Sequence, residues 1–278
     1  MKTLLISSLL ALSACAPKQS NLEPAPMAQV ELPSAESLFE ASIEASKQTE
    51  TIASLSSFRV QSLMKIPQAG IEGEIEMSWA SPTKILVEQN IPGIGSGRVG
   101  FNGETGWSSD NMMGPRIIDG KELEELLFDS SIDSDLNFRE WYTDLKTVEM
   151  TEFNGIASYK VLATTRFGRE STLYFDAETR LGIGASHQVE SPMGAMVMEI
   201  FHQEWADFDG VLLPKISQVA TGPVVMEMEV LSIEQNPEFP EGLFELPPEI
   251  QELLEEEEQA QEEADTEQPA EESPTESP

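Results

Sequence analysis

Residues that commonly carry catalysis are scarce in this sequence. Its single cysteine, Cys15, excludes a disulfide within the chain. Its two histidines, His187 and His202, have neither the spacing nor the flanking carboxylates of a zinc signature, so we expect structural roles and no metal or other cofactor. No serine stands in a Gly-x-Ser-x-Gly elbow. We therefore expect a protein that is not an enzyme. A carboxylate pair for glycoside hydrolysis is the one catalytic alternative left open.

Basic residues are also few. Sixteen Lys and Arg stand against 50 Asp and Glu, which gives a net charge of −34. Nucleic-acid phosphates are met by Lys and Arg, so this balance excludes nucleic acid as a partner. From Gln251 to the end there are twelve acidic residues and no basic one. With its glutamate, proline and serine, the segment 251–278 is predicted to be a disordered acidic tail.

Long hydrophobic runs are missing. The apolar stretch from Leu4 to Leu12 follows Lys2 and is too short to span a bilayer, so residues 1–14 are predicted to be a signal peptide. Its end, Leu12-Ser13-Ala14-Cys15, resembles the lipobox of bacterial lipoproteins. An ordinary signal peptide that happens to hold a cysteine is the alternative.

The lipobox resemblance implies cleavage before Cys15, a diacylglyceryl thioether on its sulfur and an acyl group, for example palmitate, on its amino terminus. Ala16 stands where an Asp would favour the inner membrane, so the resemblance implies an outer-membrane lipoprotein, which we expect to face the periplasm. Residues 15–33 are then the lipidated cysteine and a proline-rich tether.

Strand signals fill the rest of the chain. Ile71, Ile75, Met77 and Trp79 alternate with acidic or small residues, and Val224 to Val230 alternates in the same way. Asn154-Gly155 and Asp209-Gly210 are typical of tight hairpins. Ser34 is predicted to cap one long helix ahead of the strands, and short helices are predicted at 121–128 and 136–142. An antiparallel, up-and-down sheet follows.

This element order resembles the outer-membrane lipoprotein-sorting proteins, the LolA/LolB-like superfamily, across residues 34–250. The phrases that carry the resemblance are Val99-Gly100-Phe101-Asn102-Gly103 with Gly106-Trp107, Tyr174-Phe175-Asp176 and Phe244-Glu245-Leu246-Pro247. The resemblance implies a mainly β fold with helices (α+β): a strongly curved antiparallel sheet of about eleven strands forms an incomplete barrel, plugged by the N-terminal and mid-chain helices. It also implies an apolar cavity for acyl chains. No single residue motif of the family transfers by position.

Two groups of apolar residues are the candidate ligand contacts. Alternation and flexible thioethers favour a set of cavity-lining residues, with ordinary core packing as the alternative: Ile75, Met77, Trp79, Met226 and Met228. Methionines beside glycine-rich turns are predicted at the cavity mouth or in contact with a membrane: Met112, Met113, Met193 and Met196.

Two functions fit these expectations. The first is a lipid-anchored envelope protein that binds acyl chains or lipoproteins, for lipoprotein or lipid transfer or sorting at the outer membrane. The alternative is a non-catalytic envelope-stress sensor or scaffold of the same fold that binds another periplasmic protein. An apolar cavity would favour the first, and a filled interior with a protein-binding rim would favour the second.

Overall fold

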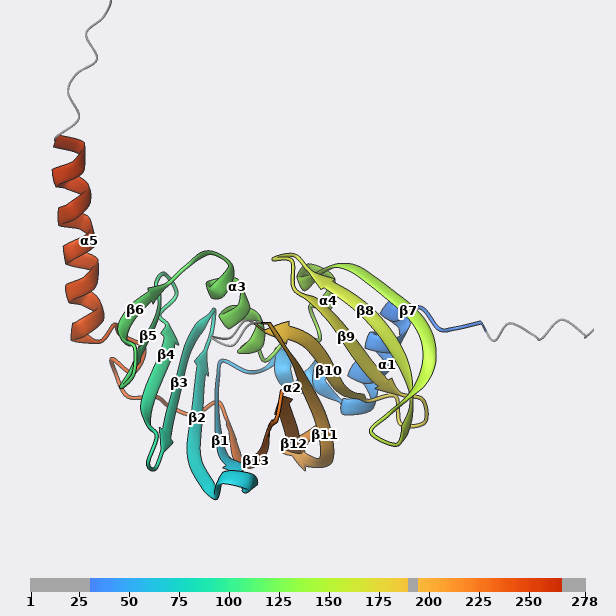
Figure 1. Cartoon of the computed structure of the whole chain (residues 1–278). Helices are drawn as coiled ribbons and strands as arrows, with labels where there is room; N and C mark the ends of the chain where they lie inside the picture. The colour runs from blue at the N-terminus through green and yellow to red at the C-terminus, as the bar shows by residue number, and fades with distance from the viewer. Residues whose placement is uncertain (1–30, 190–194, 267–278) are drawn as a thin grey trace, which may run out of the picture. The chain divides into compact units, whose positions relative to one another are not determined.

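A computed structural model describes residues 31–189 and 195–266 (Figure 1). Contacts divide the chain into Met1–Glu31 and Leu32–Pro278, and the fold below belongs to the second unit. All thirteen strands that the described residues form belong to one antiparallel sheet, in the order β6-β5-β4-β3-β2-β1-β13-β12-β11-β10-β9-β8-β7. The strands are β1 (Ser57–Ile66), β2 (Ile71–Ala80), β3 (Lys84–Ile91), β4 (Gly95–Phe101), β5 (Gly106–Asp110), β6 (Gly114–Ile118), β7 (Tyr142–Phe153), β8 (Ile156–Thr165), β9 (Glu170–Asp176), β10 (Gly182–Val189), β11 (Met196–Phe208), β12 (Val211–Thr221) and β13 (Val224–Gln235).

The sheet is curved but not closed, because its two edge strands do not pair. The first strand, β1, pairs with the last, β13, and the chain runs outward from this seam to β6 and then returns from β7. The connection between the two edges carries α3 (Gly120–Asp129) and α4 (Phe138–Trp141). Figure 1 shows α3 between the two halves of the sheet and α4 beside β8 and β9. The predicted incomplete barrel with helices is confirmed.

The thirteen strands of the described residues exceed the predicted count of about eleven, and β6 is a strand that the sequence pattern did not indicate. Gly114-Pro115 opens this strand, and proline at a strand start reads as a breaker. As an edge strand, β6 needs hydrogen-bond donors on one side only, so Pro115 is tolerated. The predicted helix at 136–142 is also shorter, because Tyr142 already belongs to β7.

The N-terminal helix is broken in two. The side-chain oxygen of Ser34 caps α1 (Ala35–Ser46) by accepting the Ser37 N–H at 3.2 Å. At Lys47 the backbone turns left-handed (φ 56°), and α2 (Gln48–Ala53) starts anew. Leu38 and Phe39 of α1 are buried in a cluster with Phe138, Val161 and Phe175. Phe39 and Phe138 stack at 4.5 Å between ring centroids.

Register separates two faces of the sheet. Phe58 lies opposite Trp79, and Trp79 opposite Ile85, so these side chains share one face. We call it the inner face, because helices cover it. Residues of α2 lie across a cavity from Phe58. Gly106 shares this face through its pairing with Phe101, which lies opposite Ile85, and Leu123 of α3 lies close to Gly106. The outer face carries the alternate residues.

The C-terminal segment covers part of the outer face. Ile250 (0% exposed) is buried with Leu86 and Trp107, and Leu243, Phe244, Leu246 and Leu253 pack around them. Ile250 and Leu253 belong to the first turns of a helix, α5 (Pro248–Thr266). A disordered tail had been predicted from residue 251 onward. The tail prediction is wrong for residues 251–266. Ile250 and Leu253 anchor the first turns, and the Glu, Gln and Ala residues that follow are strong helix formers. Residues 267–278 lie outside the described part.

We expect Ile250→Ala to destabilise the protein by about 2–5 kcal/mol, because it empties a fully buried site. Truncation after Leu254 is the matched comparison. It removes residues whose described side chains, 255–260, are all exposed, so the free energy of unfolding should change by less than about 0.5 kcal/mol. Denaturant unfolding measures both. A truncation that costs as much as Ile250→Ala would show that the distal part of the tail packs on the sheet.

Candidate functional site

A cavity of about 240 Å³ lies between the inner face and the segment that joins α3 to α4. Helix α2 forms one of its walls. Its lining is Gln48, Thr51, Ile52, Leu55, Phe58, Met77, Asp129, Ser130, Ser131, Ile132, Ser134, Asp135, Phe208, Val211, Leu213, Ile233 and Gln235. This volume is slightly below the ~300–1,000 Å³ of typical ligand pockets.

Apolar side chains come from both layers of the cavity wall. The sheet supplies Phe58 and Met77 from adjacent strands, with Leu213 and Ile233 from β12 and β13. Ile52 comes from α2, and Leu55 comes from the segment that joins α2 to β1. Alternation places these strand residues on the inner face, and the left-handed turn at Lys47 redirects α2 after α1 ends. A hydrocarbon segment that lies against these side chains would contact apolar groups.

Polar side chains gather on the α3–α4 segment. Asp129 accepts two hydrogen bonds from Arg169, at 2.7 and 3.0 Å, and this guanidinium is itself largely buried. Asp135 is exposed to the cavity, yet the surrounding protein raises the pKa of its carboxyl by desolvation. Within the described residues, Asp135 has no hydrogen-bond or ion-pair partner. The cavity is therefore amphipathic, with an uncompensated carboxyl at its polar end.

The five predicted cavity residues separate in the structure. Met77 lines the cavity. Trp79, Met226 and Met228 lie on the same inner face by register, but outside the cavity. Met228 lies opposite Met64, a buried residue of β1, so it belongs to the packed part of this face.

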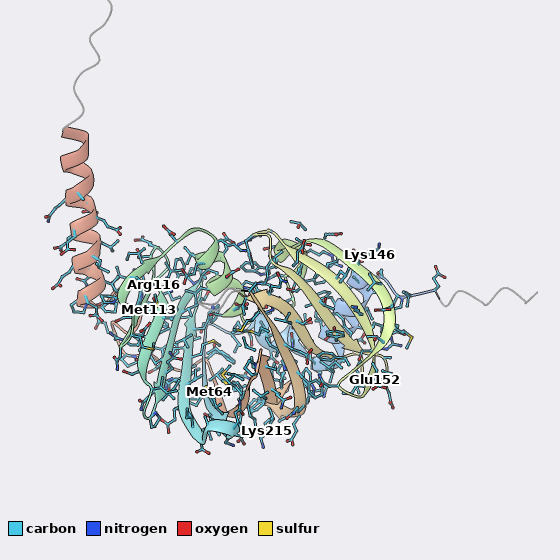
Figure 2. All side chains as sticks on the ribbon, in the orientation of Figure 1. Met64, Met113, Arg116, Lys146, Glu152 and Lys215 are labelled. Carbon is cyan, nitrogen blue, oxygen red and sulfur yellow. The ribbon has the colours of Figure 1, made fainter. Side chains whose placement is uncertain are left out.

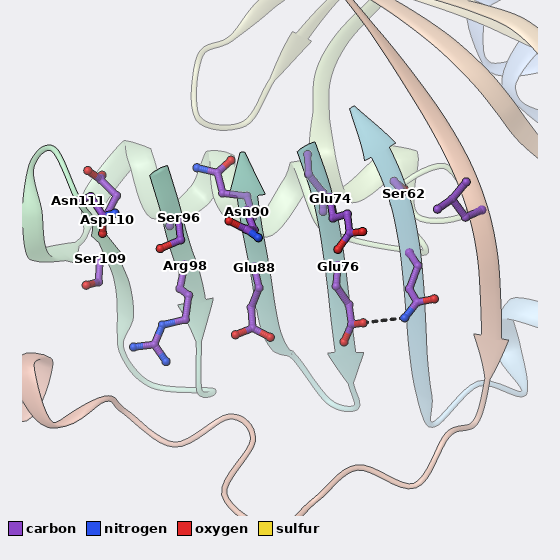
Figure 3. A pocket seen from close by; sticks show the side chains of 15 residues that line it. Ser62, Glu74, Glu76, Glu88, Asn90, Ser96, Arg98, Ser109, Asp110 and Asn111 are labelled. Carbon is purple, nitrogen blue, oxygen red and sulfur yellow. Dashed lines mark hydrogen bonds between the residues drawn. The ribbon is translucent and has the colours of Figure 1, made fainter. Parts of the chain in front are cut away.

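Ile75 contributes instead to a second hollow, a groove of about 640 Å³ mainly on the outer face (Figure 3). Its side chains come chiefly from β1 to β5 and include Glu74, Glu76 and Glu88. Glu76 accepts a hydrogen bond from Gln61 at 3.0 Å, and Arg98 at the groove's border pairs with Glu249 of α5 at 3.0 Å. This groove was not predicted, because glutamates that alternate with apolar residues are typical of the solvated face of a strand.

The predicted mouth residues lie at strand ends. Met112 and Met113, 84% and 75% exposed, occupy the β5–β6 turn, and Ile94 on the neighbouring β3–β4 turn is also exposed. The Asp110 carboxylate accepts the N–H groups of Met112 and Met113, each at 2.7 Å, and these bonds lower the pKa of Asp110. Figure 2 shows Met113 near the β6 edge and Met64 near the middle of the sheet. Met196 is half-buried at the start of β11, and Met193 lies outside the described residues.

The two histidines do not meet. His187 lies opposite Met198, whereas His202 lies opposite Ser217, and its Nδ1 is 2.8 Å from the Ser217 Oγ. Burial lowers the pKa of His202 to about 4. In residues 31–189 and 195–266, no three His, Cys, Asp or Glu side chains are grouped to hold a metal ion. No helix in those same ranges is long and apolar enough to cross a membrane.

His202 should make stability depend on pH. Its pKa falls from 6.5 to about 4 on folding, so the unfolded chain binds the proton first as pH falls below 6.5. The stabilisation is present above pH 6.5 and is lost towards pH 4, by about 3 kcal/mol in total. We expect His202→Gln to show a smaller loss of unfolding free energy between pH 7 and 4.5 than the wild type. Equal losses in both proteins would contradict this assignment.

Solved structures of other proteins have a similar architecture. No family model matches the sequence, and no curated protein matches it either. A DUF1329 family protein from Desulfovibrio piger matches in structure with a TM-score of 0.52 at 10% identity, over 77% of this chain and 98% of that one. An outer membrane lipoprotein-sorting protein domain from Vibrio parahaemolyticus matches with a TM-score of 0.50 at 9% identity, over 76% and 97%. This chain has the LolA-like fold. A LolA superfamily protein from Nitrosomonas europaea gives 0.49 at 12% identity, over 77% and 99%.

At these identities the likeness concerns the fold alone. The resemblance on which the sequence analysis relied is confirmed at this level. The predicted lipidation site Cys15 and residues 16–30 of the predicted tether lie outside the described residues. What the LolA-like fold does in this protein has to be argued from its own cavity.

Proposed function

We propose that this protein is a lipid-anchored protein of the bacterial cell envelope that binds an acyl chain in the inner-face cavity, for lipid or lipoprotein transfer at the outer membrane. The observation that carries the proposal is the set of apolar side chains that line the cavity: Phe58, Met77 and Ile233 of the sheet, Ile52 of α2, and Leu55 just after α2. Burial of hydrocarbon against such a wall contributes about 0.8 kcal/mol per CH₂ group. The LolA-like fold supports the same ligand class by analogy only.

The cavity volume limits the mode of binding. About 240 Å³ holds part of a long acyl chain, so a longer chain requires α2 or the α3–α4 segment to move outward. Helix α2 is suited to such a movement: it is short, and a left-handed residue separates it from α1. The exposed methionines of the β5–β6 turn, Met112 and Met113, are proposed to contact the membrane during transfer.

Organic extraction of the purified Leu32–Pro278 unit tests the proposal. We expect mass spectrometry of the extract to show acyl-chain lipids, and we expect the extracted protein to take up a fluorescent acyl probe saturably, with about one site per chain. Absence of lipid together with non-saturable uptake would contradict it. That result would favour the alternative, a sensor or scaffold whose partner is another periplasmic protein.

A further inference from the structure

The cavity offers a ligand hydrogen-bond acceptors but no positive charge. Its polar lining consists of hydroxyls, amides and the carboxyls of Asp129 and Asp135, and among the described residues no Lys, Arg or His lines it. The guanidinium of Arg169, which pairs with the lining residue Asp129, is already held by both oxygens of that carboxylate. This pair is neutral as a whole. The charge that remains for a ligand is the carboxyl of Asp135.

Asp135 occupies an unfavourable position without a ligand. The protein around it desolvates the carboxyl and raises its pKa, and no charge or hydrogen bond from a described residue offsets that cost. Asp135 is nonetheless an exposed residue, and it lines the cavity. The ionised form of a desolvated carboxyl becomes more favourable when a cation or a strong donor pairs with it. A bound ligand is therefore the natural partner of this group.

We propose that the cavity selects amphiphiles whose headgroup carries a protonated amine, with Asp135 accepting its N–H while the chain lies against Ile52, Met77 and Leu213. This inference rests on the proposed function and names the headgroup class. Anionic headgroups such as carboxylate or phosphate are disfavoured, because they would face Asp135 in a protein of net charge −34. The hydroxyls of Ser130, Ser131 and Ser134 supply further acceptors around the amine.

Three probes of equal chain length isolate the headgroup. Dodecylamine, dodecanol and dodecanoate are added below their micelle concentrations to the Leu32–Pro278 unit loaded with a fluorescent acyl probe. A hydrogen bond to a charged partner in a desolvated site predicts that dodecylamine displaces the probe at concentrations about tenfold or more lower than dodecanol. Dodecanoate should be the weakest competitor of the three.

Asp135→Asn is the decisive variant. Dodecylamine should fall to the potency of dodecanol, while dodecanol itself should be unchanged. Glu140→Gln, an exposed position on α4, removes the same charge without facing the cavity and should keep the preference for the amine. Asp135→Ser serves if the amide variant does not fold, with the same expectation.

The outcomes separate the two proposals. A variant that loses the amine preference supports the role of Asp135. Probe binding without any amine preference in the wild type would overturn this inference and leave acyl-chain binding standing. Failure of the wild type to bind the probe at all would overturn both. Equal loss of the preference in Glu140→Gln would reduce the effect to overall charge and also overturn the inference.

Discussion

Cys15→Ser should abolish palmitate labelling and release the protein from the membrane fraction. The proposed diacylglyceryl group is attached through the cysteine sulfur, and the chain has no other cysteine to replace it. Several acyl chains give stable anchoring, since each buried CH₂ group contributes about 0.8 kcal/mol. Without Cys15 none of these acyl chains is attached, so the predicted membrane anchor is lost. Metabolic labelling and fractionation of cells that produce each protein measure the effect.

The matched control is Ser13→Ala, which keeps a small residue within Leu12-Ser13-Ala14-Cys15. It should be processed and labelled like the wild type. Cys15→Ser should instead accumulate as the uncleaved precursor. Continued labelling of Cys15→Ser would refute the anchor, and an unlabelled but cleaved wild type would indicate an ordinary signal peptide.

Local patterns were enough to predict an antiparallel, up-and-down sheet, whereas the incomplete barrel was predicted from the family resemblance. Strand β2 shows why: its register places Met77 opposite Val60 and Val87, while Glu76 lies on the opposite face, as the alternation predicted. Turn residues such as Asn154 and Asp209 adopt the positive φ angles (49° and 51°) that hairpins of this kind require. Each of these signals is local, so a single sequence contains it.

Long-range packing could not be predicted in the same way. The burial of Ile250 depends on Leu86 and Trp107, which lie far away in the sequence, and no periodicity reports that contact. The break between α1 and α2 depends on the left-handed backbone of Lys47, a residue that helices normally accept. Strand β6, which contains Pro115, was not predicted, because the sequence does not say which strand will be an edge.

The site was predicted in part for the same reason. Alternation correctly predicted the face on which Met77 lies. It could not tell which residues of that face line the cavity and which pack together around Met64 and Met228. Asp135 was missed because a carboxyl in an irregular segment of an acidic chain looks like one more solvated charge. Only the arrangement of that segment over the inner face identifies it as a cavity residue.

Met77→Trp should give a folded protein that no longer takes up an acyl probe. Met77 is half-buried and borders the cavity, so a larger side chain has space to enter. The indole would fill much of the volume that a chain segment needs, and we expect affinity for the probe to fall at least about tenfold, or about 1.4 kcal/mol. The free energy of unfolding should change by less than about 1 kcal/mol, because the usual cost of overpacking arises in a filled core.

Two further tryptophan variants are the controls for Met77→Trp. Ile85→Trp places the same ring at a fully packed position on the neighbouring strand, where only 1% of the residue is exposed, and should destabilise the protein by about 1–3 kcal/mol. Met113→Trp places it on the exposed β5–β6 turn and should change neither stability nor probe affinity. If Met77→Trp is destabilised as much as Ile85→Trp, the cavity is closed core in solution. If it folds and still binds the probe with wild-type affinity, the acyl chain lies elsewhere, and the inner-face cavity loses its proposed role.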